Sequence, residues 1–321
     1  MLTFNQYLDM VNGAIARLQY PEQPARLYEP IAYTMDLGGK RLRPVLTLMA
    51  CEAMGGKADD ALDAALAIEM FHNFTLLHDD VMDRADRRRG KPTVHCQWND
   101  NVAILSGDTM LTLATQLMTR ARRFDLLDLF NRTAIEIYEG QQLDMDFESR
   151  DTVALDEYIE MIRLKTSVLL GCACKTGALA AGAGDDDAQA LYRMGVDLGL
   201  AFQLQDDWLD VWGDPLTFGK EIGGDIANNK KTFLLINALN RATGEQATLL
   251  RQWLDTGSER HDDKVKAVTA IYEQLGLKEL AQDEIARYSR RALQWLDSVK
   301  MGNDAHEAFA ALINRLTRRD R

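Results

Sequence analysis

The sequence predicts an all-α protein. Only six of its 321 residues are proline, and none lies between Pro92 and Pro215. Ala, Leu, Met, Glu and Arg fill that interval at helical spacing, as in residues 103–121, and these residues favour helices. No segment alternates apolar and polar side chains with a period of two over more than a few residues, so no strand is required. The apolar content of 46% is sufficient for a large core.

Glycine, proline and charged clusters divide the chain into about ten helices of ordinary globular length. These breaks fall at residues 38–41, 54–60, 87–92, 122–125, 148–152, 181–187, 213–225, 242–245 and 255–263. None has the Pro/Gly/Ser-rich composition of an interdomain linker. We therefore expect one domain over residues 1–321.

Charge and cysteine usage exclude several classes of protein. The net charge of −12 argues against a nucleic-acid partner, because a phosphate backbone requires a basic face. The four cysteines form no C-x-x-C pair, which is typical of reduced thiols, so we expect a cytoplasmic location. The N-terminus does not have the pattern of a signal peptide. No uncharged run approaches the ~18 residues of a membrane span.

Two copies of the pattern D-D-x-x-D are the most informative feature of the sequence. Each copy ends an apolar helical segment, the first with Asp79 to Asp83 and the second with Asp206 to Asp210. Because residues four apart share a helix face, the first and last aspartate of each copy project together. Mg²⁺ prefers such oxygen ligands together with waters and substrate phosphates. Two such faces around one cavity would hold a diphosphate through Mg²⁺.

A single D-D-x-x-D among 49 acidic residues is usually no more than a solvated helix face. Two copies at the ends of apolar helices, with basic segments nearby, favour the metal site instead.

Basic residues lie before and after the first acidic motif. Residues 38–44, G-G-K-R-L-R-P, contain glycines that allow a ligand to approach the backbone. Lys40 and Arg43 lie beside a predicted helix N-terminus, which favours anions. Residues 87–93, R-R-R-G-K-P-T, add guanidinium groups that bind phosphate oxygens in pairs. Either segment alone is compatible with a plain basic loop, but with the acidic motif they indicate a second diphosphate site.

A glycine-rich segment with several lysines follows the second acidic motif. It runs from Thr217 to Thr232 and contains Lys220 and Lys230. Such a segment can close over a phosphate and exclude water, although an exposed flexible loop has the same composition. Gln203 lies three residues before Asp206 and therefore shares its helix face.

The order of these motifs resembles the trans-isoprenyl diphosphate synthases, the group that includes farnesyl and geranylgeranyl diphosphate synthases. The shared motifs are G-G-K-R-L-R-P, H-x-x-x-x-x-x-D-D-x-x-D, R-R-G-K-P-T, F-Q-L-Q-D-D-x-x-D and G-K…G-D-I…N-K-K-T, between about residues 38 and 235. Five ordered motifs make the resemblance specific. It implies an all-α bundle around a deep central cavity, usually in a homodimer.

The resemblance also implies a chemistry and a set of site residues. Isopentenyl diphosphate would condense with an allylic diphosphate that three Mg²⁺ hold, and diphosphate would be released. The implied metal ligands are Asp79, Asp83 and Asp206, supported by Asp80, Asp207 and Asp210. The allylic diphosphate would contact Arg88, Lys165, Lys220 and Lys230, and isopentenyl diphosphate would contact Lys40, Arg43, His72 and Arg89. Lys165, Thr166 and Gln203 would flank the allylic cation, with Gln141 and Asp144 behind them.

Product length should depend on the residues before the first acidic motif. Phe74 and Phe71 lie five and eight residues before Asp79, hence roughly 7.5 and 12 Å deeper along the helix. Thr75 beside Phe74 is small. An aromatic residue here with no aromatic beside it resembles the pattern of family members that stop at geranylgeranyl diphosphate. Farnesyl diphosphate synthases often have two bulkier side chains at these positions. The sequence is therefore compatible with a product of either fifteen or twenty carbons. The alternative role for both phenylalanines is ordinary core packing.

Other activities require different features. A terpene cyclase or a head-to-head synthase shares the metal motifs, but a cyclase needs no second diphosphate site at residues 38–44. A non-catalytic subunit of a heteromeric prenyl synthase would be expected to have damaged acidic motifs, and both are intact here. A longer-chain polyprenyl synthase is disfavoured by the two large side chains at Phe74 and Phe71.

Overall fold

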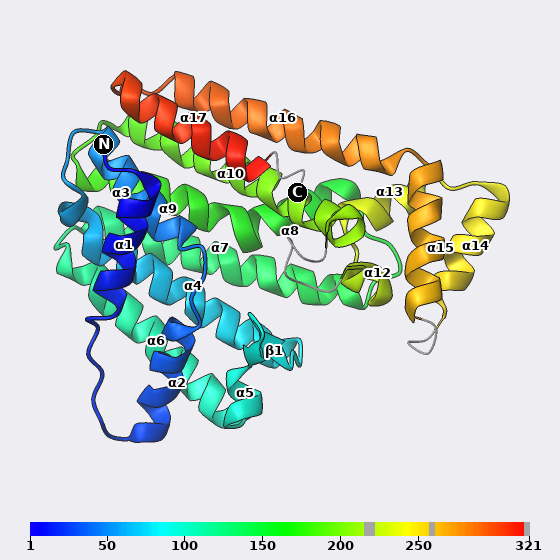
Figure 1. The fold of residues 1–321 in the computed structure, drawn as a ribbon, viewed down its shortest axis with the longest axis horizontal. Helices are drawn as coiled ribbons and strands as arrows, with labels where there is room; N and C mark the ends of the chain where they lie inside the picture. The colour runs from blue at the N-terminus through cyan, green and yellow to red at the C-terminus, as the bar shows by residue number, and fades with distance from the viewer. Residues whose placement is uncertain (215–221, 257–260, 318–321) are drawn as a thin grey trace. The chain divides into compact units, whose positions relative to one another are not determined.

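The protein is predominantly helical, as the sequence predicted (Figure 1). The computed structural model describes residues 1–214, 222–256 and 261–317. Contacts between Cα atoms divide the chain into two compact units of three segments each. The first unit comprises Met1–Thr133, Cys172–Tyr192 and Val299–Ala308, and the second comprises Ala134–Gly171, Arg193–Ser298 and Phe309–Arg321. A single domain over residues 1–321 stays a prediction.

The first unit contains the N-terminal helices and a short hairpin. Its elements are α1 (Phe4–Ile15), α2 (Ala25–Asp36), α3 (Leu42–Ala53), the 3₁₀ turn η1 (Ala58–Ala61), α4 (Leu62–Met82), β1 (Arg87–Arg88), β2 (Lys91–Pro92), α5 (Val94–Gln97) and α6 (Asp100–Arg120). Helix α4 packs along α6 and also contacts α1, α2 and α3. This position explains why α4 is apolar on most of its surface and is buried from Ala64 to Phe71.

Sequence-local signals account for several helix ends in this unit. Thr3 and Gln6 form a reciprocal capping box that begins α1. Asn99 accepts a hydrogen bond from the Val102 amide at 2.9 Å and begins α6. Helix α3 begins at Leu42, directly after the predicted break at residues 38–41.

The basic segment after α4 forms a β-hairpin, although the sequence required no strand. Arg87 pairs with Pro92 and Arg88 pairs with Lys91. Arg89 and Gly90 between them have φ angles of 54° and 77°. Two consecutive residues with positive φ form the type of two-residue turn that matches the natural twist of a hairpin. The pairing is too short to produce a period-two pattern, which is why the sequence did not reveal it.

The second unit is built on helices from the C-terminal half. Its complete elements are α8 (Leu155–Ile162), the π-helical turn η2 (Arg163–Ser167), α12 (Gly224–Ala227), α13 (Phe233–Arg241), α14 (Gly244–Leu254), α15 (His261–Gln274) and α16 (Leu277–Asp297). The division between units falls within or beside α7 (Phe124–Glu148), α9 (Val168–Ala180), α10 (Asp185–Trp212) and α17 (Asn303–Thr317). Among the described residues, no helix is long and apolar enough to cross a membrane.

Helices α7 and α10 approach the π-helical turn of the second unit closely. A Cβ on Gly140 of α7 would lie 2.3 Å from the backbone nitrogen of Lys165. A Cβ on Gly199 of α10 would lie 2.6 Å from Cα of Ser167. Both helices therefore reach the backbone of η2 only because they present glycine there. Turns of this kind are rare and are frequent at functional sites.

Two glycine substitutions test this packing. Gly140→Ala should destabilise the fold by about 1–3 kcal/mol, because the new methyl group must displace the backbone of η2. Gly13→Ala is the matched control, since its Cβ would meet only the Arg17 side chain at 3.5 Å. That change should be neutral or stabilise the helix by about 0.5–1 kcal/mol. Urea denaturation of both variants measures the difference, and equal effects would contradict the close approach.

Candidate active site

The first acidic motif closes the C-terminal end of α4. Asp79 is half-buried, with a side chain that is 19% exposed, whereas Asp83 is exposed at the helix end. Asp80, the second of the three aspartates in the motif, is only 4% exposed. The first and last aspartates are therefore more exposed than Asp80, although Oδ1 of Asp79 is itself buried.

Asp80 is held by Arg88 from the hairpin. The Arg88 Nε lies 2.8 and 2.9 Å from the two Asp80 oxygens, and its Nη2 lies 2.7 Å from Oδ1. Burial raises the pKa of Asp80, and the Arg88 guanidinium opposes that shift. Burial also disfavours the Arg88 cation, but its hydrogen bonds to Asp80 outweigh this and raise its pKa. The same guanidinium reaches to 3.9 Å from Oδ2 of Asp79.

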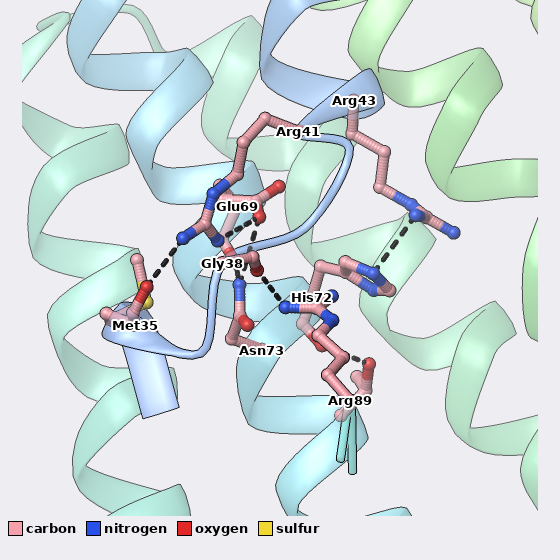
Figure 2. A network of polar contacts seen from close by, with 9 residues as sticks. Met35, Gly38, Arg41, Arg43, Glu69, His72, Asn73 and Arg89 are labelled. Atoms are coloured by element: carbon pink, nitrogen blue, oxygen red, sulfur yellow. Dashed lines mark hydrogen bonds and ion pairs between the residues drawn. The ribbon is translucent and has the colours of Figure 1, made fainter. Parts of the chain in front are cut away.

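A second group of basic side chains surrounds the middle of α4 (Figure 2). Nη1 of Arg43 lies 3.1 Å from Nε2 of His72, and Arg89 donates a hydrogen bond to the carbonyl of Gly38. Lys40 is exposed on the same loop. The sequence predicted that Lys40, Arg43, His72 and Arg89 share one subsite, and the structure gathers them in the first unit.

The pKa of His72 lies well below its ordinary value. Burial is the largest cause, followed by the positive charges of Arg43, Arg89, Arg88 and Arg41. The ring is therefore neutral, and Nε2 accepts the hydrogen bond that Arg43 donates. Burial also lowers the pKa of Arg43 to about 10 and lowers that of Arg89. Burial is the largest cause of all three shifts, and the neighbouring guanidinium groups add to each of them, so an anion bound here would favour the charged forms.

The second acidic motif lies on α10 and uses its middle aspartate differently. Asp207 is 4% exposed and accepts hydrogen bonds from the Tyr158 hydroxyl and, at 3.1 Å, from Nε2 of Gln203. Burial raises the pKa of Asp207 to about 7, and repulsion from Asp225 adds to the shift. Asp206 is half-buried beside it.

Asp210 connects this motif to the next helix. It is 8% exposed, and its Oδ2 accepts a hydrogen bond at 3.0 Å from the Asp225 amide in the first turn of α12. Lys230, 46% exposed, lies 4.0 Å from Oδ1 of Asp225. Lys220 and the neighbouring predicted residues Thr217 to Gly219 lie outside the described residues.

The π-helical turn η2 carries Lys165 and Thr166. Nζ of Lys165 lies 2.5 Å from Oδ2 of Asp144 on α7. The Thr166 hydroxyl lies 3.3 Å from Oε1 of Gln203. Since Nε2 of Gln203 donates to Asp207, the amide is oriented with its oxygen toward Thr166. Sequence reasoning missed Tyr158, which begins this chain of hydrogen bonds, because nothing local to position 158 marks it.

The aromatic residues before the first acidic motif are buried in the first unit. Phe74 is 5% exposed and Phe71 is fully buried. Their ring centroids lie 5.5 Å apart, and Phe130 lies 5.2 Å from Phe71. The His78 ring lies 4.8 Å from Phe74, and its Nε2 lies 3.1 Å from the Ile104 carbonyl. Thr75 is half-buried and donates to the His72 carbonyl at 2.8 Å.

The acidic residues fit Mg²⁺ only in partnership with a phosphate. Across the described ranges, no group of three or more His, Cys, Asp or Glu side chains is placed to hold a metal by itself. The oxygen donors at Asp79 and Asp83 nevertheless have the chemistry that Mg²⁺ prefers, since this ion keeps several waters and takes one or two carboxylates plus substrate phosphates.

Known proteins resemble this chain over most of its length. A family model described as polyprenyl synthetase matches residues 24–272. The geranylgeranyl diphosphate synthase of Methanosarcina mazei is 44% identical over 236 residues, which are 72% of this chain and 73% of that protein. The geranylfarnesyl diphosphate synthase of Natronomonas pharaonis is 35% identical over 296 residues, 86% and 85% of the two chains.

Solved structures agree with the sequence comparison. A crystal structure of a geranylgeranyl pyrophosphate synthase superposes with a TM-score of 0.95 at 44% identity, over 99% of both chains. The matched region includes both acidic motifs, both basic segments and the π-helical turn. The chain belongs to the polyprenyl synthetase family and is a prenyltransferase, as the order of its motifs predicted.

Proposed function

We propose that the protein condenses isopentenyl diphosphate head-to-tail with an allylic diphosphate and releases diphosphate. The observation that supports this most directly is the basic group around His72 on α4, two helical turns before Asp79. A cyclase with a single diphosphate has no use for such a group. A condensing enzyme requires it, because it binds two diphosphates at once.

Each predicted residue takes a role in this proposal. Asp79, Asp83 and Asp206 bind Mg²⁺, with Asp80, Asp207 and Asp210 in support, and three ions accompany the allylic diphosphate. Bound Mg²⁺ supplies charge neutralisation that makes the diphosphate a better leaving group. Arg88, Lys165, Lys220 and Lys230 contact the same diphosphate. Lys40, Arg43, His72 and Arg89 hold isopentenyl diphosphate.

The protein's own groups stabilise charge as it develops. The allylic carbon–oxygen bond breaks, the isopentenyl double bond attacks the resulting cation, and the departing diphosphate removes the final proton. Lysine and arginine side chains offset the negative charge on the leaving group. Oxygens of Thr166 and Gln203 face the cation, and the contact of Gln203 with Asp207 supports that orientation.

Assembly, product and location complete the proposal. We propose a homodimer, supported by apolar side chains that α6 and α7 expose, including Leu105 at 58% and Ile135 at 57%. A product of twenty carbons is supported by the relatives named geranylgeranyl diphosphate synthase, and fifteen carbons is the alternative. A cytoplasmic location is supported by four free cysteines, since thiols persist in reducing compartments.

The activity itself is tested with purified protein and Mg²⁺. Labelled isopentenyl diphosphate should be incorporated when dimethylallyl, geranyl or farnesyl diphosphate is the partner, and diphosphate should be released. Chromatography of the products with each starter reports both the reaction and the chain length. Absence of turnover with all three starters at saturating Mg²⁺ would rule the proposal out.

Two substitutions separate the proposed substrate subsites. Asp79→Ala should lower kcat by orders of magnitude, because its interaction is made mainly in the transition state. Arg43→Ala should chiefly raise KM for isopentenyl diphosphate and leave KM for the allylic substrate near normal. Asp63→Ala is the control on α4, since Asp63 lies in the first turn of the helix and pairs with the exposed Arg120 at 3.6 Å. The reverse pattern of KM changes would mean that the subsites are interchanged.

Phe74→Ala tests the proposed limit on chain length. If a growing prenyl tail ends against Phe74, the product should lengthen by at least one isoprene unit. The loss of stability should then be smaller than the ~3–5 kcal/mol expected for a large residue in a packed core. Phe130→Ala, which removes a ring beside Phe71, should destabilise the fold without changing the product. An unchanged product with a large stability loss would make Phe74 an ordinary core residue.

A further inference from the structure

Arg41 is a buried cation to which none of the roles above is assigned. It is 5% exposed, whereas Lys40 before it is exposed. Its Nη1 lies 2.7 Å from Oε1 of Glu69, and both side chains are 3% exposed. Its Nη2 donates to the carbonyl of Met35 at 2.5 Å (Figure 2). Because its terminal nitrogens are occupied inside the protein, Arg41 is not placed to bind a substrate phosphate.

The partner of Arg41 is itself fixed on α4. Oε1 of Glu69 also accepts a hydrogen bond from Nδ2 of Asn73 at 3.1 Å. The same Nδ2 donates to the Glu69 carbonyl at 2.8 Å. These buried hydrogen bonds restrict the side chains that make them, although Nε of Arg41 has no hydrogen-bond partner among the described residues. Residues 38–41 are therefore attached to the turn of α4 that also carries His72.

The backbone of this loop requires such an attachment. Gly38, Gly39 and Arg41 have φ angles of 79°, 131° and 45°. A left-handed conformation is unfavourable for arginine and persists only where the surroundings determine it. The contacts of Arg41 with Glu69 and Met35 provide that determination. Helix α3 then begins at the next residue, Leu42.

The attached loop sets the positions of both arginines that the basic group uses. Arg89 donates to the Gly38 carbonyl, and a Cβ on Gly39 would lie 2.7 Å from its Nη2. Arg43 follows Arg41 by two residues and places its Nη1 3.1 Å from His72. The separation of the two guanidinium groups thus depends on where Arg41 holds the loop.

We propose that Arg41, through its buried contact with Glu69, is a positioning residue for isopentenyl diphosphate that sets the spacing of Arg43 and Arg89 without touching the substrate. The inference rests on the proposed function, because it specifies how one subsite of that function is built. A purely structural role for the pair would affect stability alone, and the two roles are separable by experiment.

The test replaces both partners at once. Breaking one partner of a buried ion pair is strongly destabilising, whereas replacing both by apolar residues of similar size is often neutral for folding. The double variant Arg41→Met with Glu69→Met should therefore keep Tm near that of the wild-type protein. Its KM for isopentenyl diphosphate should still rise about tenfold or more, because the guanidinium groups of Arg43 and Arg89 are no longer held at the spacing that the substrate requires. KM for the allylic substrate should stay near normal.

A folded double variant with the wild-type KM for isopentenyl diphosphate would overturn the proposal. Arg41→Lys provides a second measurement if the double variant does not fold. Lysine keeps the charge beside Glu69, but one ammonium group cannot reproduce the fork that serves both Glu69 and Met35. The same selective rise in KM is expected in smaller measure, and an unchanged KM would again overturn the proposal.

A control breaks an ion pair in the second unit of which only the carboxylate is buried, since the Arg291 side chain is 45% exposed. Arg291 lies 3.2 Å from Asp197, whose side chain is 3% exposed. Arg291→Met should lower Tm without changing either KM, and a rise in KM for isopentenyl diphosphate would assign the effect to lost stability and refute positioning.

Failure of the proposed function is distinguishable from failure of this inference, because the wild-type protein would then show no turnover. Calorimetry with inorganic diphosphate still tests positioning in that case: weaker binding by the double variant supports it, and equal binding overturns it.

Discussion

The grouping of four arginines beside α4, of which only Arg41 is fully buried, is the constraint on which the first unit depends. Two carboxylates in this region each neutralise one arginine, Glu69 for Arg41 and Asp80 for Arg88. Arg43 and Arg89 instead have neutral partners, a histidine ring and a backbone carbonyl. Two of the four guanidinium charges are thus balanced inside the protein, and two retain the attraction for an anion that a diphosphate subsite requires.

His72 is suited to this surrounding because it can be neutral. A permanently charged side chain at this position would add to the repulsion among the arginines, whereas a neutral imidazole accepts a hydrogen bond from Arg43. Burial and the neighbouring positive charges hold its pKa far below the ordinary value. The ring therefore orients a guanidinium group without cancelling its charge.

The two acidic motifs are alike in sequence and different in their electrostatics. Asp80 faces a cation, so its negative charge is balanced where it lies. Asp207 has neutral hydrogen-bond donors from Tyr158 and Gln203 and a like charge nearby in Asp225, and its pKa rises to about 7. Its contacts lead through Gln203 to Thr166 on the π-helical turn. The middle aspartate of each copy thus organises a different neighbour: a cation in the first unit and an amide in the second.

The sequence by itself determined the features that arise from local periodicity. Helical spacing predicted the fold class and most helix ends, and the i,i+4 rule placed Asp79 and Asp83 on one face. The hairpin at Arg89 and Gly90 escaped prediction, because a ladder of two pairs has no period to detect. Only the tertiary structure decided which partner each buried charge received. Arg41 and Glu69 are 28 residues apart, and Tyr158 and Asp207 are 49 apart. Hydrogen bonds between residues so far apart in sequence depend on how the helices pack, so no local pattern encodes them. The same holds for the close approach of Gly140 and Gly199 to the π-helical turn.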